Sequence, residues 1–177
     1  MATCNVINGI DGICDRKNAQ GIKIVYIGEI PSAATLTNIT EYATIDETTE
    51  IISNLSGATS NIDLYKYVFA KDMATYVGTP TATAFGVFWD QVLTLDFAKM
   101  TAEKRLEIMA LSYSQRLVCV MVDFNNNAWT MGLSAGASMT GGLEQLTTEN
   151  KYQVVLSAKE STPAYNTSLA AITAAIV

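Results

Sequence analysis

The sequence predicts a mainly β fold, an antiparallel β-sandwich or barrel with one long projecting hairpin and one flanking α-helix. Short runs of alternating apolar and polar residues recur between turn residues. Two of these runs are adjacent and unusually long, and only one segment has convincing helical periodicity. The chain has 177 residues, 49% of them hydrophobic, which suits one core and leaves too little for two large domains.

The chain divides into three parts. Residues 1–20 carry turn signals and little periodicity, so an irregular arm is expected there. Residues 21–165 hold the periodic runs and predict a single β-sandwich domain. Residues 166–177 form a small, apolar and uncharged tail, which we expect to pack on another subunit because free chain ends seldom have this composition. The expected contact residues of the tail are Leu169, Ile172 and Ile176.

The first regular elements are expected to be short strands. Residues 21–29 are rich in β-branched side chains and end before a proline, which predicts a strand. Residues 32–42 are mixed and small, and we expect a loop. Residues 42–46 and 50–55 flank a polar turn and are expected to pair as a hairpin, with a helical turn as the alternative for the second piece.

Residues 64–98 predict the long hairpin. Two alternating runs of about 14 residues flank a glycine- and proline-containing loop, whereas strands are usually about 5 or 6 residues long. At about 3.3 Å per residue each arm would reach roughly 45 Å, beyond the core of a domain of this size. We therefore expect the tip to project and to contact a neighbouring subunit. The tip residues are Gly78, Thr79, Pro80, Thr81 and Phe85.

The expected register sorts the hairpin residues onto two faces. Folding about Pro80 and Thr81 pairs odd positions with odd ones, which places Tyr67 opposite Leu95. The odd face is apolar and is expected to meet the helix. The even face is mixed and net acidic, and it carries Asp72, Asp90, Thr94 and Asp96.

Residues 101–114 predict the one helix, with Thr101 as its N-cap. One stripe of apolar positions is expected to pack on the sheet. Its members are Ala102, Leu106, Met109, Ala110 and Tyr113. Residues 116–124 are almost continuously apolar, which is typical of a central strand covered on both faces. The last strands are expected at 128–133 and 151–158, on either side of a glycine-containing segment.

The composition argues against an enzyme and against a nucleic-acid reader. The chain has no histidine, the usual general base, and its net charge of -6 repels phosphate backbones. Gly132-Leu133-Ser134-Ala135-Gly136 matches the G-x-S-x-G turn of hydrolases, but no imidazole exists to activate the serine. We expect no catalytic activity and no cofactor.

No metal site is expected either. Asp123 to Asn127 begins like a calcium loop but lacks the glycine at position six and the glutamate at position twelve, so a β-turn explains it better. Zinc needs four nitrogen or sulfur ligands, and the chain has three cysteines and no histidine. Cys4 and Cys14 are either a disulfide clip or reduced thiols, and Cys119 is expected to pack as a small hydrophobe.

The addressing signals predict a soluble, cytosolic product. The N-terminus has no basic region, and no apolar run reaches the roughly 18 residues that a membrane span needs. No membrane partner is expected.

The order of elements resembles that of the tail tube proteins of long-tailed bacteriophages, in which a β-sandwich with a flanking helix carries a long hairpin that bridges subunits. Four segments also look like small virion structural proteins from phages of Bacteroidetes-type hosts. These segments are LYKYVFAKD (64–72), VLTLDFAKMTAEKRLEIMALS (92–112), RLVCVMVDFNNNAWTMG (116–132) and KYQVVLSAKESTPAY (151–165). The resemblance covers roughly residues 20–165 and rests on the order of the elements and on the wording of these four sequence segments rather than on an invariant motif.

The resemblance implies a structural role in the virion. It implies hexameric rings of identical subunits that stack into a tube, with other tail or neck proteins as partners and with DNA passing down the bore during ejection. The protein would be made in the host cytoplasm and end in the tail. The even hairpin face, with Asp72, Asp90, Thr94 and Asp96, would then line an acidic bore that does not hold DNA.

Two other classes stay open. The first is another virion component of similar fold, such as a head-to-tail connector, a tail terminator or a capsid decoration protein. The second is a β-sandwich that binds a sugar or a host surface, for which Trp129 with Tyr152 or Tyr165 are the candidate aromatic residues.

Overall fold

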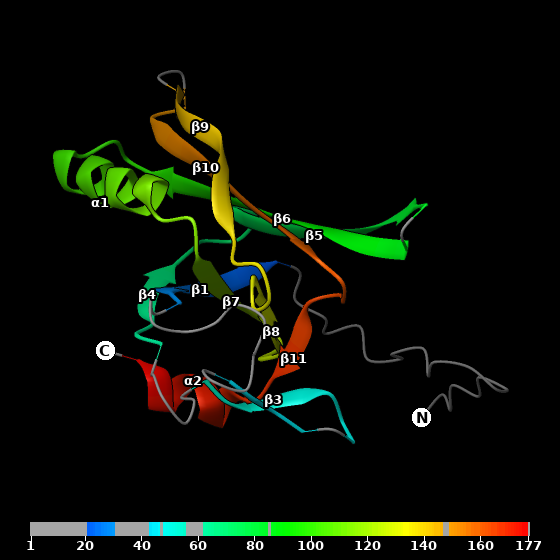
Figure 1. Ribbon diagram of the computed structural model, residues 1–177. Coiled ribbons are helices and arrows are strands. Elements are labelled where there is room, and N and C mark those ends of the chain that lie inside the picture. The colour runs from blue at the N-terminus through cyan, green and yellow to red at the C-terminus, as the bar shows by residue number, and fades with distance from the viewer. Residues whose placement is uncertain are drawn as a thin grey trace, which may run out of the picture.

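Two β-sheets and two helices make up the part of the chain that the structure describes (Figure 1). In this computed structural model that part comprises residues 21–30, 43–46, 48–55, 62–84, 86–146 and 149–176. The predictions for the arm at 1–20, the loop at 32–42, the Cys4 and Cys14 thiols and Phe85 lie outside it. The expectation of a mainly β fold is confirmed.

One sheet has seven strands in the order β2-β3-β11-β8-β7-β1-β4. Its strands are β1 (Ile22–Glu29), β2 (Thr44–Ile45), β3 (Ile51–Asn54), β4 (Tyr65–Val68), β7 (Leu117–Asp123), β8 (Ala128–Met131) and β11 (Tyr165–Thr167). The strand β7 lies centrally between β8 and β1, as its apolar sequence predicts. The pair β3–β11 is parallel, so this sheet is mixed, with its other strand pairs antiparallel.

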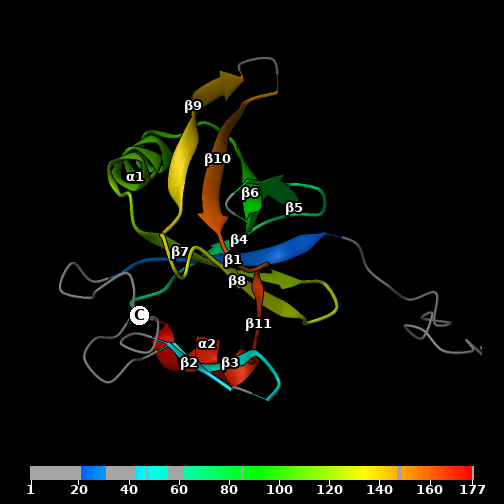
Figure 2. The same cartoon turned by 45° about the vertical axis from the view of Figure 1, so that its right-hand side comes forward.

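The other sheet has four antiparallel strands in the order β5-β6-β10-β9. Its strands are β5 (Ala74–Thr83), β6 (Gly86–Ala98), β9 (Ser138–Leu146) and β10 (Lys151–Glu160). Figures 1 and 2 show this sheet stacked on the middle of the seven-stranded one, with the strands of the two sheets crossing steeply. The strands β5 and β9 are its two edges.

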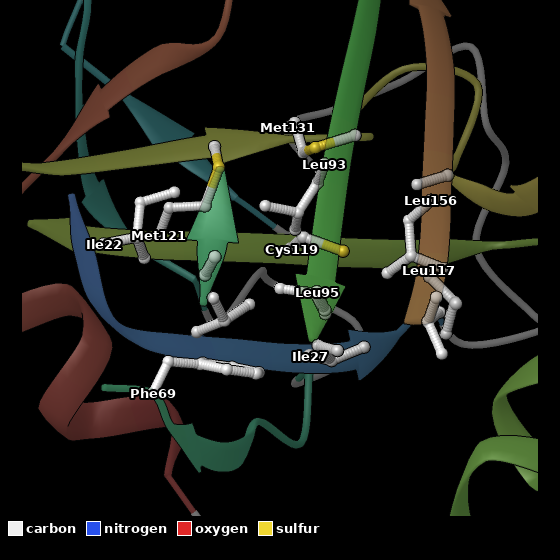
Figure 3. Close-up of a cluster of buried hydrophobic side chains, with 14 of the residues drawn as sticks. Ile22, Ile27, Phe69, Leu93, Leu95, Leu117, Cys119, Met121, Met131 and Leu156 are labelled. Carbon is white, nitrogen blue, oxygen red and sulfur yellow. The ribbon is translucent and has the colours of Figure 1, made fainter. Parts of the chain in front are cut away.

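Two hydrophobic clusters hold the layers together. The first lies between the sheets, where Cys119 and Met121 of β7 meet Leu93 and Leu95 of β6 (Figure 3). The second lies on the opposite face of the seven-stranded sheet, where Val118, Val120 and Val122 point toward β3 and the C-terminal helix. Alternate residues of β7 therefore serve both clusters, which explains why its sequence is apolar throughout.

The helix α1 (Ala102–Tyr113) matches the prediction in its extent and caps. The Thr101 hydroxyl accepts a hydrogen bond from the Lys104 amide at 3.3 Å. The predicted packing face is wrong, because Ile108 is the buried residue while Leu106 and Tyr113 are 67% and 78% exposed.

The first predicted hairpin arm is two strands. A turn at residues 70–73, in which Asp72 has a φ of 65° and the Met73 amide donates to the Ala70 carbonyl at 3.2 Å, separates β4 from β5. The strand β4 pairs with β1 in the other sheet. The expected single arm from 64 to 77 is therefore wrong, because the Lys71-Asp72 pair makes a turn in the middle of it.

The predicted turn and register of the hairpin are also wrong. Gly78, Thr79, Pro80 and Thr81 lie within β5, and the last pair before the turn is Thr83 with Gly86. Ala74, not Tyr67, lies opposite Leu95, so even positions of β5 pair with odd positions of β6. Pro80 is compatible with this edge strand because only one side of β5 has a partner among the described strands.

The C-terminal tail is structured within its own chain. After β11, Ser168 caps the helix α2 (Leu169–Ala175), and its hydroxyl accepts from the Ala171 amide at 3.2 Å. Ile172 is 2% exposed in the second cluster. The expectation that another subunit is needed to order this tail is wrong, because the tail completes the chain's own core.

Candidate functional site

Among the described residues, the end of the β5–β6 hairpin has no neighbouring strand beyond its own two. The strand β10 pairs with β6 only as far as Trp89, which lies opposite Glu160. Beyond that point residues 81–83 pair with residues 86–88 as a two-stranded ribbon, and Figure 1 shows this ribbon extending past the rest of the four-stranded sheet. We call this segment the overhang.

The overhang exposes both backbone and apolar side chains. Thr81 to Ala84 and Gly86 to Phe88 are all exposed, and the exposed fractions of Val87 and Phe88 are 54% and 40%. Val77, at the root of the overhang, is 58% exposed. Of the predicted tip residues, Gly78, Thr79 and Pro80 lie at this root, and Thr81 is the first residue of the overhang.

The second candidate surface is the open face of the four-stranded sheet. Asp90, Thr94 and Asp96 alternate along β6 and share the face opposite the buried Leu93 and Leu95. Asp72 does not belong to this face, because it lies in the turn before β5. Three of the four residues predicted to face the lumen therefore lie on one face, and Asp72 does not.

Lysines from β10 neutralise these carboxylates. Lys151 Nζ lies 2.8 Å from Asp96 Oδ2 and also contacts Glu149, and Gln153 donates to Asp96 Oδ1 at 2.9 Å. Hydrogen bonds to Asp96 and then to Glu149 raise the pKa of Lys151, so the lysine stays charged. The Asp96 and Lys151 side chains are only 15% and 17% exposed, which holds this pair in place.

The second acidic position is more loosely paired. The Thr81 hydroxyl donates to Asp90 Oδ2 at 2.6 Å, and Lys159 Nζ is 3.6 Å from Asp90 Oδ1. The Lys159 side chain is 82% exposed, so this ion pair adds little stability. Three carboxylates and two lysines take part in these ion pairs, so the charge of the group is -1.

The G-x-S-x-G segment has a structural role. The Ser134 amide donates to Glu160 Oε1 at 3.0 Å, and Gly132 and Gly136 both have a left-handed φ. The loop thus surrounds the Glu160 carboxylate, and Glu160 is 2% exposed. Burial raises the pKa of Glu160, although hydrogen bonds from the backbone amides of the loop act to lower it. No arrangement of a nucleophile and a base was expected here.

The aspartate of the Asp123 to Asn127 segment caps a β-turn. Asp123 Oδ1 accepts the backbone amides of Asn125 and Asn127 at 2.8 and 2.7 Å, which is the bonding of an Asx turn. Among the described residues, no group of three or more acidic or cysteine side chains could hold a metal ion. Burial raises the pKa of Cys119 to about 12, so this thiol is inert in the first cluster.

The predicted tail contacts separate into core and surface. Ile172 is buried, whereas Leu169 and Ile176 are 46% and 41% exposed. Ile176 forms a bridge with Leu64, which fastens the end of α2 to the start of β4.

The structure rearranges the predicted aromatic group. Tyr152 is 5% exposed in the first cluster, and Tyr165 packs against the second. Trp129 lines an open groove together with Trp89 and Tyr76. The sequence carried no signal for this group, because its members come from different sheets.

No protein-family model, curated protein or solved structure matches this chain. Within the described residues, neither helix is long and apolar enough to cross a membrane.

Proposed function

We propose that the protein is a structural subunit that assembles with copies of itself, as a tail tube subunit of a bacteriophage whose stacked, hexameric rings form a conduit for DNA. The overhang carries the assembly proposal. A two-stranded ribbon is at best marginally stable alone in water. Its open edges and exposed Val87 and Phe88 therefore favour contact with another chain.

The tail tube form of the proposal has two further supports. The two packed sheets, the projecting β5–β6 hairpin and the flanking helix α1 support this form, because the resemblance of the sequence to tail tube proteins rests on an order of such elements. The ion-paired open face also suits a wall that DNA slides along, because Lys151 is held by Asp96 and Lys159 lies beside Asp90, so each lysine has a carboxylate nearby. The proposed role is structural rather than catalytic, in the virion tail, with other tail or neck proteins as partners.

Electron microscopy and light scattering of the purified protein test the proposal. The wild type is expected to form rings and open-ended stacks, because heterologous contacts that do not close continue indefinitely. Replacing residues 81–88 with Asn-Gly, a pair suited to a two-residue hairpin turn, should leave the far-UV circular dichroism intact and abolish the stacks. Val68→Lys, at a 71% exposed valine of β4, is the matched control and should still assemble.

The remaining outcomes discriminate between classes. A single closed ring that never stacks favours a terminator or connector over a tube. A wild-type protein that stays a folded monomer at high concentration contradicts the assembly proposal.

A further inference from the structure

An open groove of about 840 Å³ lies between the inner face of the β5–β6 hairpin and the β7–β8 turn. Both tryptophans of the chain line it, Trp89 from the four-stranded sheet and Trp129 from the seven-stranded sheet. Tyr76 of β5 adds a third aromatic ring. All three side chains are partly exposed, so their rings are accessible to a ligand.

The rim of the groove is polar but almost uncharged. Asn125 and Asn127 of the β7–β8 turn line it, and Asp123 is the only charged residue among the described lining residues. The carboxylate of Asp123 already accepts two backbone amides, and it accepts the side-chain amide of Asn127 at 3.1 Å. These donors are neutral amides, so the carboxylate keeps its charge and the rim repels anions, while the described lining residues offer no positive charge to hold one. A cation would have to compete with these donors for the carboxylate oxygens.

The third ring supplies a neutral hydroxyl. A tyrosine phenol keeps its proton at neutral pH, and burial raises the pKa of Tyr76 further above its ordinary value of 10.0. The groove thus offers apolar ring surfaces beside hydroxyl and carboxamide groups, and its volume lies within the roughly 300–1,000 Å³ of small-molecule sites.

We infer that this groove binds a neutral saccharide. A sugar ring has an apolar face of C–H groups that can pack on an aromatic ring, and hydroxyls that need hydroxyl and amide partners. A wholly apolar ligand could not form hydrogen bonds with Asn125 and Asn127 at the rim. This inference is independent of the proposed assembly, because the groove is formed within one chain.

Tryptophan spectroscopy tests the inference directly, because the only two tryptophans of the chain both line the groove. The full chain is titrated with cellobiose, chitobiose and maltotriose, while tryptophan emission and the two indole N–H cross-peaks are recorded. At least one sugar is expected to cause a saturable change in both signals. Trp129→Ala should weaken that binding at least about tenfold, and Trp129→Phe should retain part of it.

Two further variants complete the test. Trp89→Ala, on the hairpin, should weaken binding similarly and serves if Trp129→Ala fails to fold. Tyr113→Ala, at a 78% exposed tyrosine on α1, should bind like the wild type. The inference is overturned if no sugar gives a saturable change, if the groove variants bind as well as the wild type, or if only apolar probes bind.

Discussion

Glu160 is a buried carboxyl whose environment opposes its charge. It is 2% exposed, and burial raises its pKa above the ordinary glutamate value of 4.5 although backbone amides of residues 133–135 donate to it. The folded state therefore binds the proton more tightly than the unfolded state. The resulting stabilisation is complete below the unfolded pKa and is lost as the pH rises through the raised folded pKa.

Glu160→Gln is expected to remove this pH dependence. The amide keeps an oxygen for the Ser134 amide but cannot ionise, so the variant should gain stability relative to the wild type as the pH rises above about 4.5. Urea unfolding between about pH 4 and pH 7.5, followed by tryptophan emission, measures the difference. Parallel stability curves for the two proteins would show that Glu160 does not govern this range.

The loss of the carboxyl itself should be costly at every pH. Glu160→Ala leaves the loop amides without their acceptor, which typically costs about 1–3 kcal/mol for a buried group. This variant separates the hydrogen-bonding role of Glu160 from its ionisation.

The helix α1 shows how two apolar faces can compete on one element. Ile108 is 1% exposed in the first cluster, whereas Leu106 is 67% exposed. Ile108→Ala should therefore lower the free energy of unfolding by about 2–5 kcal/mol, and Leu106→Ala should change it by less than about 0.5 kcal/mol. Chemical denaturation of the two variants measures both free energies of unfolding. Equal losses would contradict the assignment of Ile108 to the packing face of α1.

The helix α2 packs in the core of its own chain. Ile172 packs in the second cluster and is 2% exposed, while Leu169 on the same helix is 46% exposed. We expect Ile172→Ala to destabilise the isolated subunit by about 2–5 kcal/mol and Leu169→Ala to leave its stability nearly unchanged. Thermal unfolding at a concentration where the protein is monomeric distinguishes these effects from effects on assembly.

Sequence patterns located elements better than they located faces and turns. The strands β1, β7 and β10 were predictable because their side chains alternate or are uniformly apolar between clear boundaries. The helix α1 was predictable in extent from its cap, but its apolar residues are spread around it, so periodicity alone could not select Ile108.

The missed strand β9 has a specific physical reason. Its glycines suggest a loose connection, yet Gly141 lies opposite Val155, and a Cβ atom at this position would come within 2.8 Å of the valine Cβ. The glycine here allows the two strands to approach closely. Sequence alone cannot distinguish such a glycine from one that marks a loop. The groove as a whole was equally unpredictable, because Trp89 and Trp129 come to line one groove only through the packing of the two sheets.

At the scale of the whole molecule, the overhang and the open face belong to one sheet. The overhang extends from the four-stranded sheet, and the open face is the outer side of the same sheet. If overhangs join subunits, the open faces are presented repeatedly along the assembly. The charge of this face then determines whether the assembly binds or repels a polyanion such as DNA.

Freeing Lys151 from its carboxylates should make the assembled protein retain DNA. Asp96→Asn together with Glu149→Gln removes two negative charges per subunit beside Lys151, so phosphates can replace the lost partners. Co-sedimentation of double-stranded DNA with assemblies should rise at low salt and fall back near 0.15 M, where charges are screened beyond about 8 Å. Asp63→Asn with Glu103→Gln makes the same charge change outside the four-stranded sheet and should not increase retention. Equal retention by the two double variants would show that the open face does not face DNA, and it would leave assembly through the overhang untouched.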